Sequence, residues 1–389
     1  MREALRSRPI RTLAAAQFLL EVQFWFPVWL IFLLDMGFSL TTAVLADAVF
    51  RIVSVLSEFP VGILADLVGR RRAYLALAGG SVLTFALITQ VENVPILFVA
   101  WIVWGVLWAL SSGAASAYLY ELCLQDELDI DPARAFGLVR AVGNAAMLLS
   151  LLSAGYLYDV SPQLPFAVTA SLAGVAVVLA YTLPEIRGSR VVVTIQSVIA
   201  AIRAALADHR VRRAVTLGVL LLLFGWSARI LFQPLALDLS LSTQVIGWMY
   251  AAFAAASIVG GLVAGYVGAA HRRPVLAGAF LLVLAALAAT GAVGRLGPFV
   301  LLPLMGFAYM LAFTVLEVHT NEVVAPAVRA TIFGAVSCIA GVGIAVARPS
   351  LGVIAERYSV PIAFGVWAAV GVVLVGLAIR GILRLHRAG

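Results

Sequence analysis

A few charged and amide side chains stand at helical spacing inside long apolar segments of this chain. Gln17, Glu21 and Trp25 follow one another at intervals of four residues, so a continuous helix would present all three on one face. Glu21 lies midway along its apolar segment, where an acid can act as a reversible proton carrier or contact a polar ligand. A neutral or ion-paired acid that only holds helices together is the alternative interpretation.

Two further pairs of polar residues have the same spacing. Asp47 and Arg51 are four residues apart and can form an ion pair on one helix face. Arg140 and Asn144 are also four residues apart. Each pair either lines a polar cavity or is satisfied by packing against a neighbouring helix, and we include all four residues among the candidate ligand or coupling residues.

Two isolated arginines and three aromatic residues complete the candidate site. Arg229 stands close to Trp226, and Arg348 follows a track of small residues on one helix face. A guanidinium group in such surroundings can bind an anionic group of a ligand or pair with an acid such as Glu21. The aromatic side chains that we expect to form a wall of the site are Trp108, Tyr250 and Tyr309.

The composition shows what kind of chain must position these residues. Hydrophobic residues make up 63% of the 389 residues and charged residues only 12%, whereas a soluble domain is about half apolar and a quarter charged. These proportions indicate a polytopic membrane protein. All 26 basic residues are arginine, which excludes P-loop nucleotide binding and Schiff-base catalysis because both need lysine.

Apolar windows separated by polar breaks predict twelve membrane-spanning helices and therefore an all-α fold. Spans three, six, nine and twelve carry no charged residue in their interiors, so we expect them to face lipid while the other eight enclose polar groups. A short interfacial helix is expected at 194–206. The predicted spans are 10–34, 42–66, 73–91, 95–120, 136–158, 163–183, 213–237, 243–268, 274–294, 298–319, 330–353 and 361–383.

The arginines are distributed unevenly between the two sides of these spans. With the N-terminus inside, twenty arginines flank the spans on the cytoplasmic side and only Arg295 and Arg357 lie outside. Because basic residues stay preferentially inside, we predict a multi-pass protein of a bacterial cytoplasmic (inner) membrane with both termini in the cytoplasm. The formal charge of +7 reflects these flanking arginines, and we expect no nucleic-acid partner.

The second half of the sequence repeats the first at an offset of about 200 residues. GILADLVGRRR (62–72), for example, resembles GLVAGYVGAAHRR (261–273). The repeat predicts two six-helix bundles, residues 1–184 and 213–389, joined by a cytoplasmic linker at 185–212. Parallel repeats of this kind are expected to hold a binding site between the two halves, near the middle of the membrane.

The loop between the second and third predicted spans carries the motif of a known family. Gly62, Asp66, Gly69, Arg70 and Arg71 match the pattern G-x-L-a-D-x-x-G-R-[RK]. With its twelve spans and its duplicated unit, the chain resembles the major facilitator superfamily along nearly its whole length. The resemblance implies a transporter that alternates between inward-open and outward-open shapes.

The resemblance also implies a latch. In that family the acid of the motif caps the N-terminus of span eleven, and an arginine of the motif pairs with an acid at the end of span four. Here these residues would be Asp66, Arg70 and Glu121. The second copy has Gly265 and Ala269 in place of the acid and the arginine, which predicts a one-sided latch.

These patterns together predict a secondary active transporter that moves a small amphipathic solute or organic anion by alternating access. Acids within the membrane favour proton coupling, and the aromatic residues favour efflux. An uptake symporter or a facilitator for a sugar, an organic acid or another metabolite is the alternative. We expect a monomer whose partners are a small solute, protons and the lipid bilayer.

Other classes of protein find little support in the sequence. Neither an HExxH nor a GxSxG motif is present, so we expect no enzyme and no cofactor, and a non-transporting membrane enzyme or sensor is the remote alternative. Glu317, which mirrors Glu121 in the repeat, and His319 close span ten without a further ligand at metal spacing. We therefore expect no metal site.

Overall fold

The computed structural model describes residues 6–125, 131–186, 195–290 and 294–387. Within these ranges the secondary structure is helical and contains no strand, which confirms the predicted all-α fold. Eleven helical segments in the described ranges are long and apolar enough to cross a membrane. The chain divides into two compact units, of which the first is Met1–Val191 with Thr243–Gly247 and the second is Val192–Ser242 with Trp248–Gly389.

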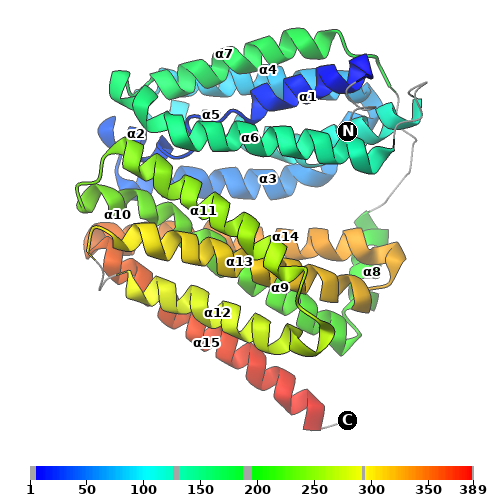
Figure 1. The fold of residues 1–389 in the computed structure, drawn as a ribbon, viewed down its shortest axis with the longest axis vertical. Coiled ribbons are helices and arrows are strands. Elements are labelled where there is room, and N and C mark those ends of the chain that lie inside the picture. The colour runs from blue at the N-terminus through cyan, green and yellow to red at the C-terminus, as the bar shows by residue number, and fades with distance from the viewer. Residues whose placement is uncertain (1–5, 126–130, 187–194, 291–293, 388–389) are drawn as a thin grey trace. The chain divides into compact units, whose positions relative to one another are not determined.

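The described part of the first unit contains seven helices, coloured blue to green in Figure 1. They are α1 (Arg8–Glu21), α2 (Trp29–Asp35), α3 (Leu40–Val68), α4 (Arg70–Thr89), α5 (Val94–Gln125), α6 (Pro132–Val160) and α7 (Leu164–Tyr181). Ser39 and Asp131 cap α3 and α6 by accepting backbone N–H groups of the first turn. Helix α5 packs against α3 and α4, while α1 packs against α6 and α7.

The second unit begins with the short helix α8 (Ile195–Ala205), at the position where the sequence predicts an interfacial helix. The remaining elements are α9 (His209–Ser227), η1 (Ala228–Leu231), α10 (Phe232–Asp238), α11 (Thr243–Ala264), η2 (Ala269–His271), α12 (Arg272–Ala289), α13 (Gly297–Val323), η3 (Pro326–Val328), α14 (Arg329–Arg357) and α15 (Val360–Arg387). In this unit α9 packs against α13 and α14, and α12 packs against α13 and α15.

The first predicted span is not the continuous helix that the hydropathy suggests. Helix α1 ends at Glu21 and α2 begins only at Trp29. Pro27 lies in the interruption, where its ring and its missing N–H oppose helix formation. The backbone N–H of Gln23, which has no helical acceptor here, donates to Ser150 Oγ of α6 at 2.9 Å. A side chain of the fifth span therefore satisfies the backbone at the break.

The seventh predicted span is interrupted in a similar way, by the 3₁₀ turn η1 between α9 and α10. Pro234 lies in the first turn of α10, just after this interruption. Two carbonyl groups at the interruption accept hydrogen bonds from other helices. Arg348 of α14 donates to Trp226 O at 3.1 Å, and Tyr250 of α11 donates to Arg229 O at 3.0 Å. Buried backbone groups that leave a helix need such partners.

Close crossings of helices recur at equivalent positions in the two units. A Cβ atom at Gly105 of α5 would lie 2.8 Å from Phe50 O of α3, and one at Gly306 of α13 would lie 2.7 Å from Phe253 O of α11. The two glycines are 201 residues apart and the two phenylalanines 203, in agreement with the offset of the sequence repeat. The duplicated unit therefore keeps the contact between its second and fourth spans.

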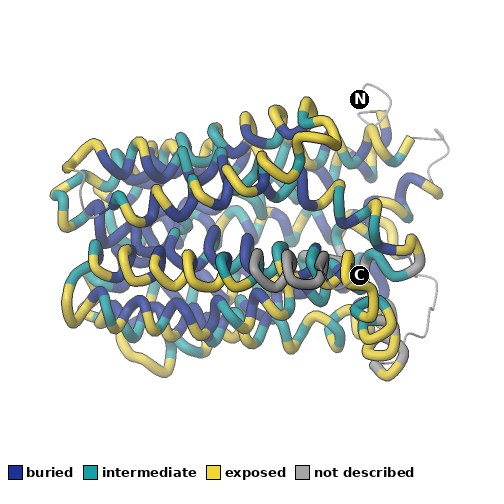
Figure 2. The backbone as a smooth tube through the Cα atoms, turned by 90° about the horizontal axis from the view of Figure 1, so that it is seen from below, coloured by how far each residue is buried: buried dark blue, intermediate teal, exposed yellow. Residues whose placement is uncertain are grey.

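Large apolar side chains are also found on the outside of the helices. Figure 2 shows that buried and exposed positions alternate along the long helices, so that each keeps one buried face. Leu56, Leu124 and Val178 are each more than 60% exposed. Exposed apolar surface on this scale is expected where helices meet hydrocarbon instead of water.

Candidate functional site

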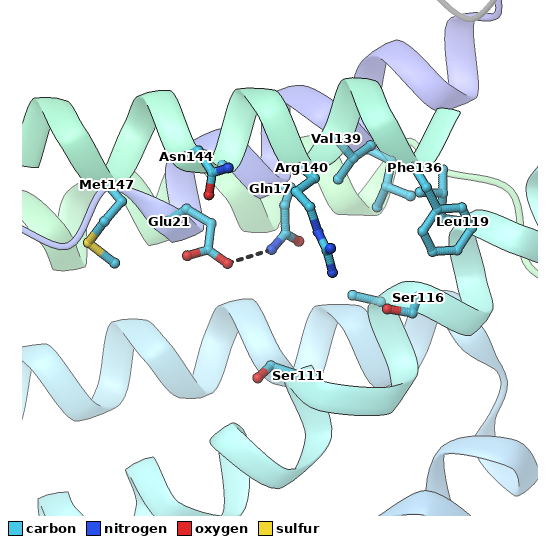
Figure 3. A pocket seen from close by; sticks show the side chains of 13 residues that line it. Gln17, Glu21, Ser111, Ser116, Leu119, Phe136, Val139, Arg140, Asn144 and Met147 are labelled. Carbon is cyan, nitrogen blue, oxygen red and sulfur yellow. Dashed lines mark hydrogen bonds between the residues drawn. The ribbon is translucent and has the colours of Figure 1, made fainter. Parts of the chain in front are cut away.

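A cavity of about 370 Å³ lies within the first unit, between α1, α5 and α6. Four residues that the sequence singles out come together in its lining: Gln17 and Glu21 from α1, and Arg140 and Asn144 from α6 (Figure 3). Figure 3 shows the Arg140 side chain reaching from α6 into the space between the three helices. The cavity thus presents a carboxylate, a guanidinium group and two amides.

A chain of hydrogen bonds holds the acid of this cavity. Gln17 Nε2 donates to Glu21 Oε1 at 2.9 Å, and Tyr74 Oη of α4 donates to Gln17 Oε1 at 3.0 Å. The Tyr74 side chain is fully buried. Tyr74 lies in the third span, which the sequence predicts to face lipid because it carries no charge. The buried face of this helix nevertheless contributes a polar group to the hydrogen bonds that hold Glu21, and a lone tyrosine in an apolar segment has no spacing pattern that would have revealed it.

Trp25 does not share the cavity with Gln17 and Glu21, because α1 ends at Glu21 and the helical spacing ends with it. The buried Trp25 ring instead packs 5.3 Å from the Phe85 ring and 5.7 Å from the Trp104 ring, between centroids. Its Nε1 donor has no hydrogen-bond acceptor among the described residues. Trp108, the next residue of this aromatic cluster, lies 6.4 Å from Trp104 and is partly exposed.

The other predicted pair of the first unit lies on α3. Asp47 is buried, and the Arg51 guanidinium group lies 5.5 Å from the centroid of the Phe50 ring. Neither Asp47 nor Arg51 lines the cavity that contains Glu21. The sequence therefore groups residues that the fold distributes over two places in the same unit.

The second unit has a cluster of arginine and aromatic side chains around the interruption of its first span. The Arg229 guanidinium group lies 4.1 Å from the Trp226 ring and 5.3 Å from the Phe253 ring. Trp226 Nε1 donates to Tyr309 Oη at 2.8 Å. Cation–π contacts of this kind hold a guanidinium group in place over the ring faces.

Arg348 and Tyr250 join this cluster through the backbone. Both side chains are buried, and both donate to carbonyl groups at the interruption, as described above. The structure thus brings Arg229, Tyr250, Tyr309 and Arg348 together, although they come from four different elements. It also gives Arg348 and Tyr250 a structural task that their residue types alone did not reveal.

The motif between the second and third spans is built around a sharp change of direction. Gly69 has φ +98°, a backbone conformation that side-chain-bearing residues rarely adopt. Arg70, the next residue, donates to the Glu121 carboxylate through Nε at 3.1 Å and Nη2 at 2.9 Å. This is the ion pair between α4 and α5 that the family resemblance implies. Gly62 lies on an open face of α3, and the side chain of Asp66 is outside the described residues.

The same loop also forms hydrogen bonds and an ion pair with residues just after the sixth span. Arg71 Nε lies 3.3 Å from a carboxylate oxygen of Glu185, and Arg71 Nη1 donates to Leu183 O at 3.4 Å. The backbone N–H of Arg70 donates to Ile186 O at 3.0 Å. Arg70 and Arg71 therefore tie three spans of the first unit together at one end.

The second unit contains a counterpart of the first ion pair. Arg272 Nη1 lies 2.5 Å from Glu322 Oε2, and these residues follow Arg70 and Glu121 by 202 and 201 positions. The prediction of a one-sided latch is therefore wrong for the ion pair, although Gly265 still stands where the first copy has Asp66. Glu322, and not Glu317, takes the place of Glu121. Among the described residues no group of three His, Cys, Asp or Glu side chains could hold a metal ion.

Comparison with known proteins gives a family match over nearly the whole chain. The sequence model of the Major Facilitator Superfamily matches residues 13–235 and, a second time, residues 215–387. The uncharacterized MFS-type transporter YxaM of Bacillus subtilis (strain 168) is 25% identical over 145 residues. This alignment covers 36% of the present chain and 34% of YxaM, so it spans about a third of that relative.

Solved structures match over almost the full length. The nucleoside transporter NupG has a TM-score of 0.77 and 16% identity, with 98% of this chain and 99% of that chain covered. The human organic anion transporter MFSD10 (TETRAN) has a TM-score of 0.59 and 15% identity, with 96% and 100% covered. At identities this low, the similarity to these structures shows a shared fold only.

Proposed function

Because the chain belongs to the Major Facilitator Superfamily and is a multi-pass membrane transporter, we propose that it couples the movement of a small solute to protons and that Glu21 carries the proton. The observation that supports this most directly is the cavity of the first unit. Glu21 lines it, and Gln17 engages only one of its carboxylate oxygens, Oε1. The other oxygen can exchange a proton with the contents of the cavity.

The proposed direction of transport is efflux in exchange for protons. Glu21 can bind either a proton or a cationic or hydrogen-bond-donating group of a solute, but not both at once, and such competition is the basis of exchange. The aromatic side chains of each unit suit an amphipathic solute with a ring. The Arg229 group in the second unit suits an acidic group of a solute.

One observation favours the alternative, an uptake symporter. Arg140 lines the same cavity as Glu21. An ionised Glu21 competes with an anionic solute for this guanidinium group, so protonation of the acid would favour anion binding. Proton and anion would then bind together and move in the same direction.

Proteoliposomes that enclose a pH-sensitive dye test the proposal and separate the two directions. A panel of aromatic amines, aromatic carboxylates and nucleosides is added outside, and the lumenal pH is followed. Exchange predicts that an added solute and protons move in opposite directions, whereas symport predicts lumenal acidification with solute entry. Glu21→Gln should abolish both signals, while Glu92→Gln, which changes an exposed acid between α4 and α5, should leave them intact. Solute-dependent proton movement that persists in Glu21→Gln would refute the role of Glu21.

We further propose that Gly62, Asp66, Gly69, Arg70, Arg71 and Glu121 form a gating element. The contacts of Arg70 and Arg71 described above support this role, because a rigid loop can transmit movement between the spans that it joins. Asp66→Asn is expected to slow transport without changing the pH at which it is half-maximal. A shifted pH profile with an unchanged rate would contradict the gating role.

A further inference from the structure

We propose that Tyr74 is a positioning residue that acts on Glu21 through Gln17 and favours the ionised form of the acid. The inference rests on the proposed proton role of Glu21 and adds a residue to it. Its basis is the direction of the hydrogen bonds in the chain from Tyr74 to Gln17 to Glu21.

The orientation of the Gln17 amide decides which form of Glu21 it supports. The Tyr74 hydroxyl group donates to Gln17 Oε1, so the amide nitrogen is turned towards Glu21 and donates to it. An N–H donor stabilises a carboxylate. If the amide turned over, its oxygen would face Glu21 and would accept a hydrogen bond only from the protonated acid.

Burial strengthens the hydrogen bond between Tyr74 and Gln17. Tyr74 is only 1% exposed, so its hydroxyl group donates from a low-dielectric environment, where a hydrogen bond is stronger than in water. With Tyr74→Phe, Gln17 loses the donor that fixes its amide, and both orientations become accessible. We therefore expect this variant to protonate Glu21 at a higher pH than the unchanged protein does.

Few other charged groups face Glu21 among the described residues. Arg140 of α6 lines the same cavity, together with the hydroxyl groups of Ser111 and Ser116 from α5. Helix α7, which also packs against α1, contains no Asp, Glu, Lys, Arg or His. Arg140 is unchanged in Tyr74→Phe, so its field does not account for a shift between the two proteins.

Infrared difference spectroscopy of the purified protein in liposomes tests the inference without a known solute, because the proton itself is the probe. The carboxyl band of Glu21 is identified by its absence in Glu21→Gln and is titrated between about pH 4 and pH 9. Tyr74→Phe should raise the midpoint by up to about one pH unit, because it removes the neutral hydrogen bond that fixes the Gln17 amide while the amide itself remains. Gln17→Leu should raise it similarly, and adding Tyr74→Phe to Gln17→Leu should change nothing further.

Tyr118→Phe is the matched control. Its ring lies 6.3 Å from that of Tyr74, and its hydroxyl group donates to Pro184 O instead of Gln17. Equal midpoints in Tyr74→Phe and the unchanged protein, or equal shifts in Tyr74→Phe and Tyr118→Phe, would overturn the inference while leaving the proton role of Glu21 intact. A Glu21 band that does not titrate in this range would overturn both. If Tyr74→Phe does not fold, an unshifted Gln17→Leu overturns the inference alone.

Discussion

Trp25 in the first unit and Trp226 in the second are 201 residues apart, and each stands at the interruption of its unit's first span. Trp226 donates its indole N–H to Tyr309, whereas that of Trp25 has no acceptor among the described residues. The residue that precedes Tyr309 by 201 positions is Trp108, which offers no hydroxyl group. The two units thus repeat the position of the ring but not the polar contact.

The charged residues differ far more than the packing does. The position of Glu21 in the repeat is occupied by Leu222 in the second unit, and the position of Arg229 by Val28 in the first. The two units therefore share the close helix crossings at glycine and the tryptophan at the interruption. Glu21, in contrast, belongs only to the first unit, and the cluster of Arg229 with aromatic rings belongs only to the second. This difference suggests a division of labour, in which the first unit handles the proton and the second an acidic group of the solute.

The strongest test of this division is Arg229→Gln. If Arg229 binds an acidic group of the solute, the variant should lose affinity by roughly 100-fold, the loss expected when a charged hydrogen bond is removed. The pH dependence set by Glu21 should remain. Solute binding is measured by isothermal titration for the first active member of the solute panel, and Arg295→Gln, which changes an exposed arginine of the same unit, is the control. A changed pH profile with intact affinity would reverse the assignment.

The contacts at the two interrupted spans are expected to differ in how much they contribute to stability, and this difference is smaller than the effect of Arg229→Gln. Arg348→Ala removes a buried guanidinium group that donates to Trp226 O and should lower the free energy of unfolding by about 2 kcal/mol. Ser150→Ala removes the acceptor of the Gln23 N–H, a neutral contact, and should cost about 1 kcal/mol. Both values are measured by denaturant unfolding in detergent micelles. Ser153→Ala on the exposed side of α6 is the control, and equal losses in Arg348→Ala and Ser150→Ala would remove the distinction.

The sequence predicts the helices of this fold well but not their interruptions. Hydropathy locates the spans because apolar length is all that a bilayer requires, and eleven of the twelve predicted spans coincide with described helical segments long and apolar enough to cross a membrane. A hydropathy window averages over a proline, so it did not register the breaks associated with Pro27 and Pro234. The break in the first span then moved Trp25 away from the face that the spacing of four residues assigned to it.

The site could be predicted only in part, for a related reason. Spacing along one helix brought Gln17 and Glu21 together correctly, and Arg140 and Asn144 likewise. Contacts between helices leave no such pattern, which is why Tyr74 was missed. Ion pairs between spans leave no sequence pattern either. The repeat places Ala269 at the position of the motif arginine and so suggested that the second copy has no ion pair. Arg272, three residues later, nevertheless pairs with Glu322.

The two ion pairs give the next comparison. The Arg70 and Glu121 side chains are 10% and 19% exposed, whereas Glu322, the partner of Arg272, is 52% exposed. Breaking a buried pair leaves one charge without compensation, while exposed pairs contribute little. Glu121→Gln should therefore reduce the free energy of unfolding by about 1.5 kcal/mol, and Glu322→Gln should leave the melting temperature unchanged. Thermal unfolding in detergent compares the two variants. A larger decrease in melting temperature in Glu322→Gln would show that the second pair contributes more to stability.

The smallest expected effect returns to the two tryptophans. Trp226→Phe removes the N–H that donates to Tyr309 and weakens the contact with the Arg229 guanidinium group, so it should cost about 1 kcal/mol of stability. Trp25→Phe loses ring area but also removes a buried donor that has no acceptor among the described residues, and these effects oppose each other. We expect Trp25→Phe to unfold at nearly the same denaturant concentration as the unchanged protein. A loss as large as that in Trp226→Phe would mean that the Trp25 N–H has a partner after all, such as a bound water or solute, and the two units would then be more alike than their contacts indicate.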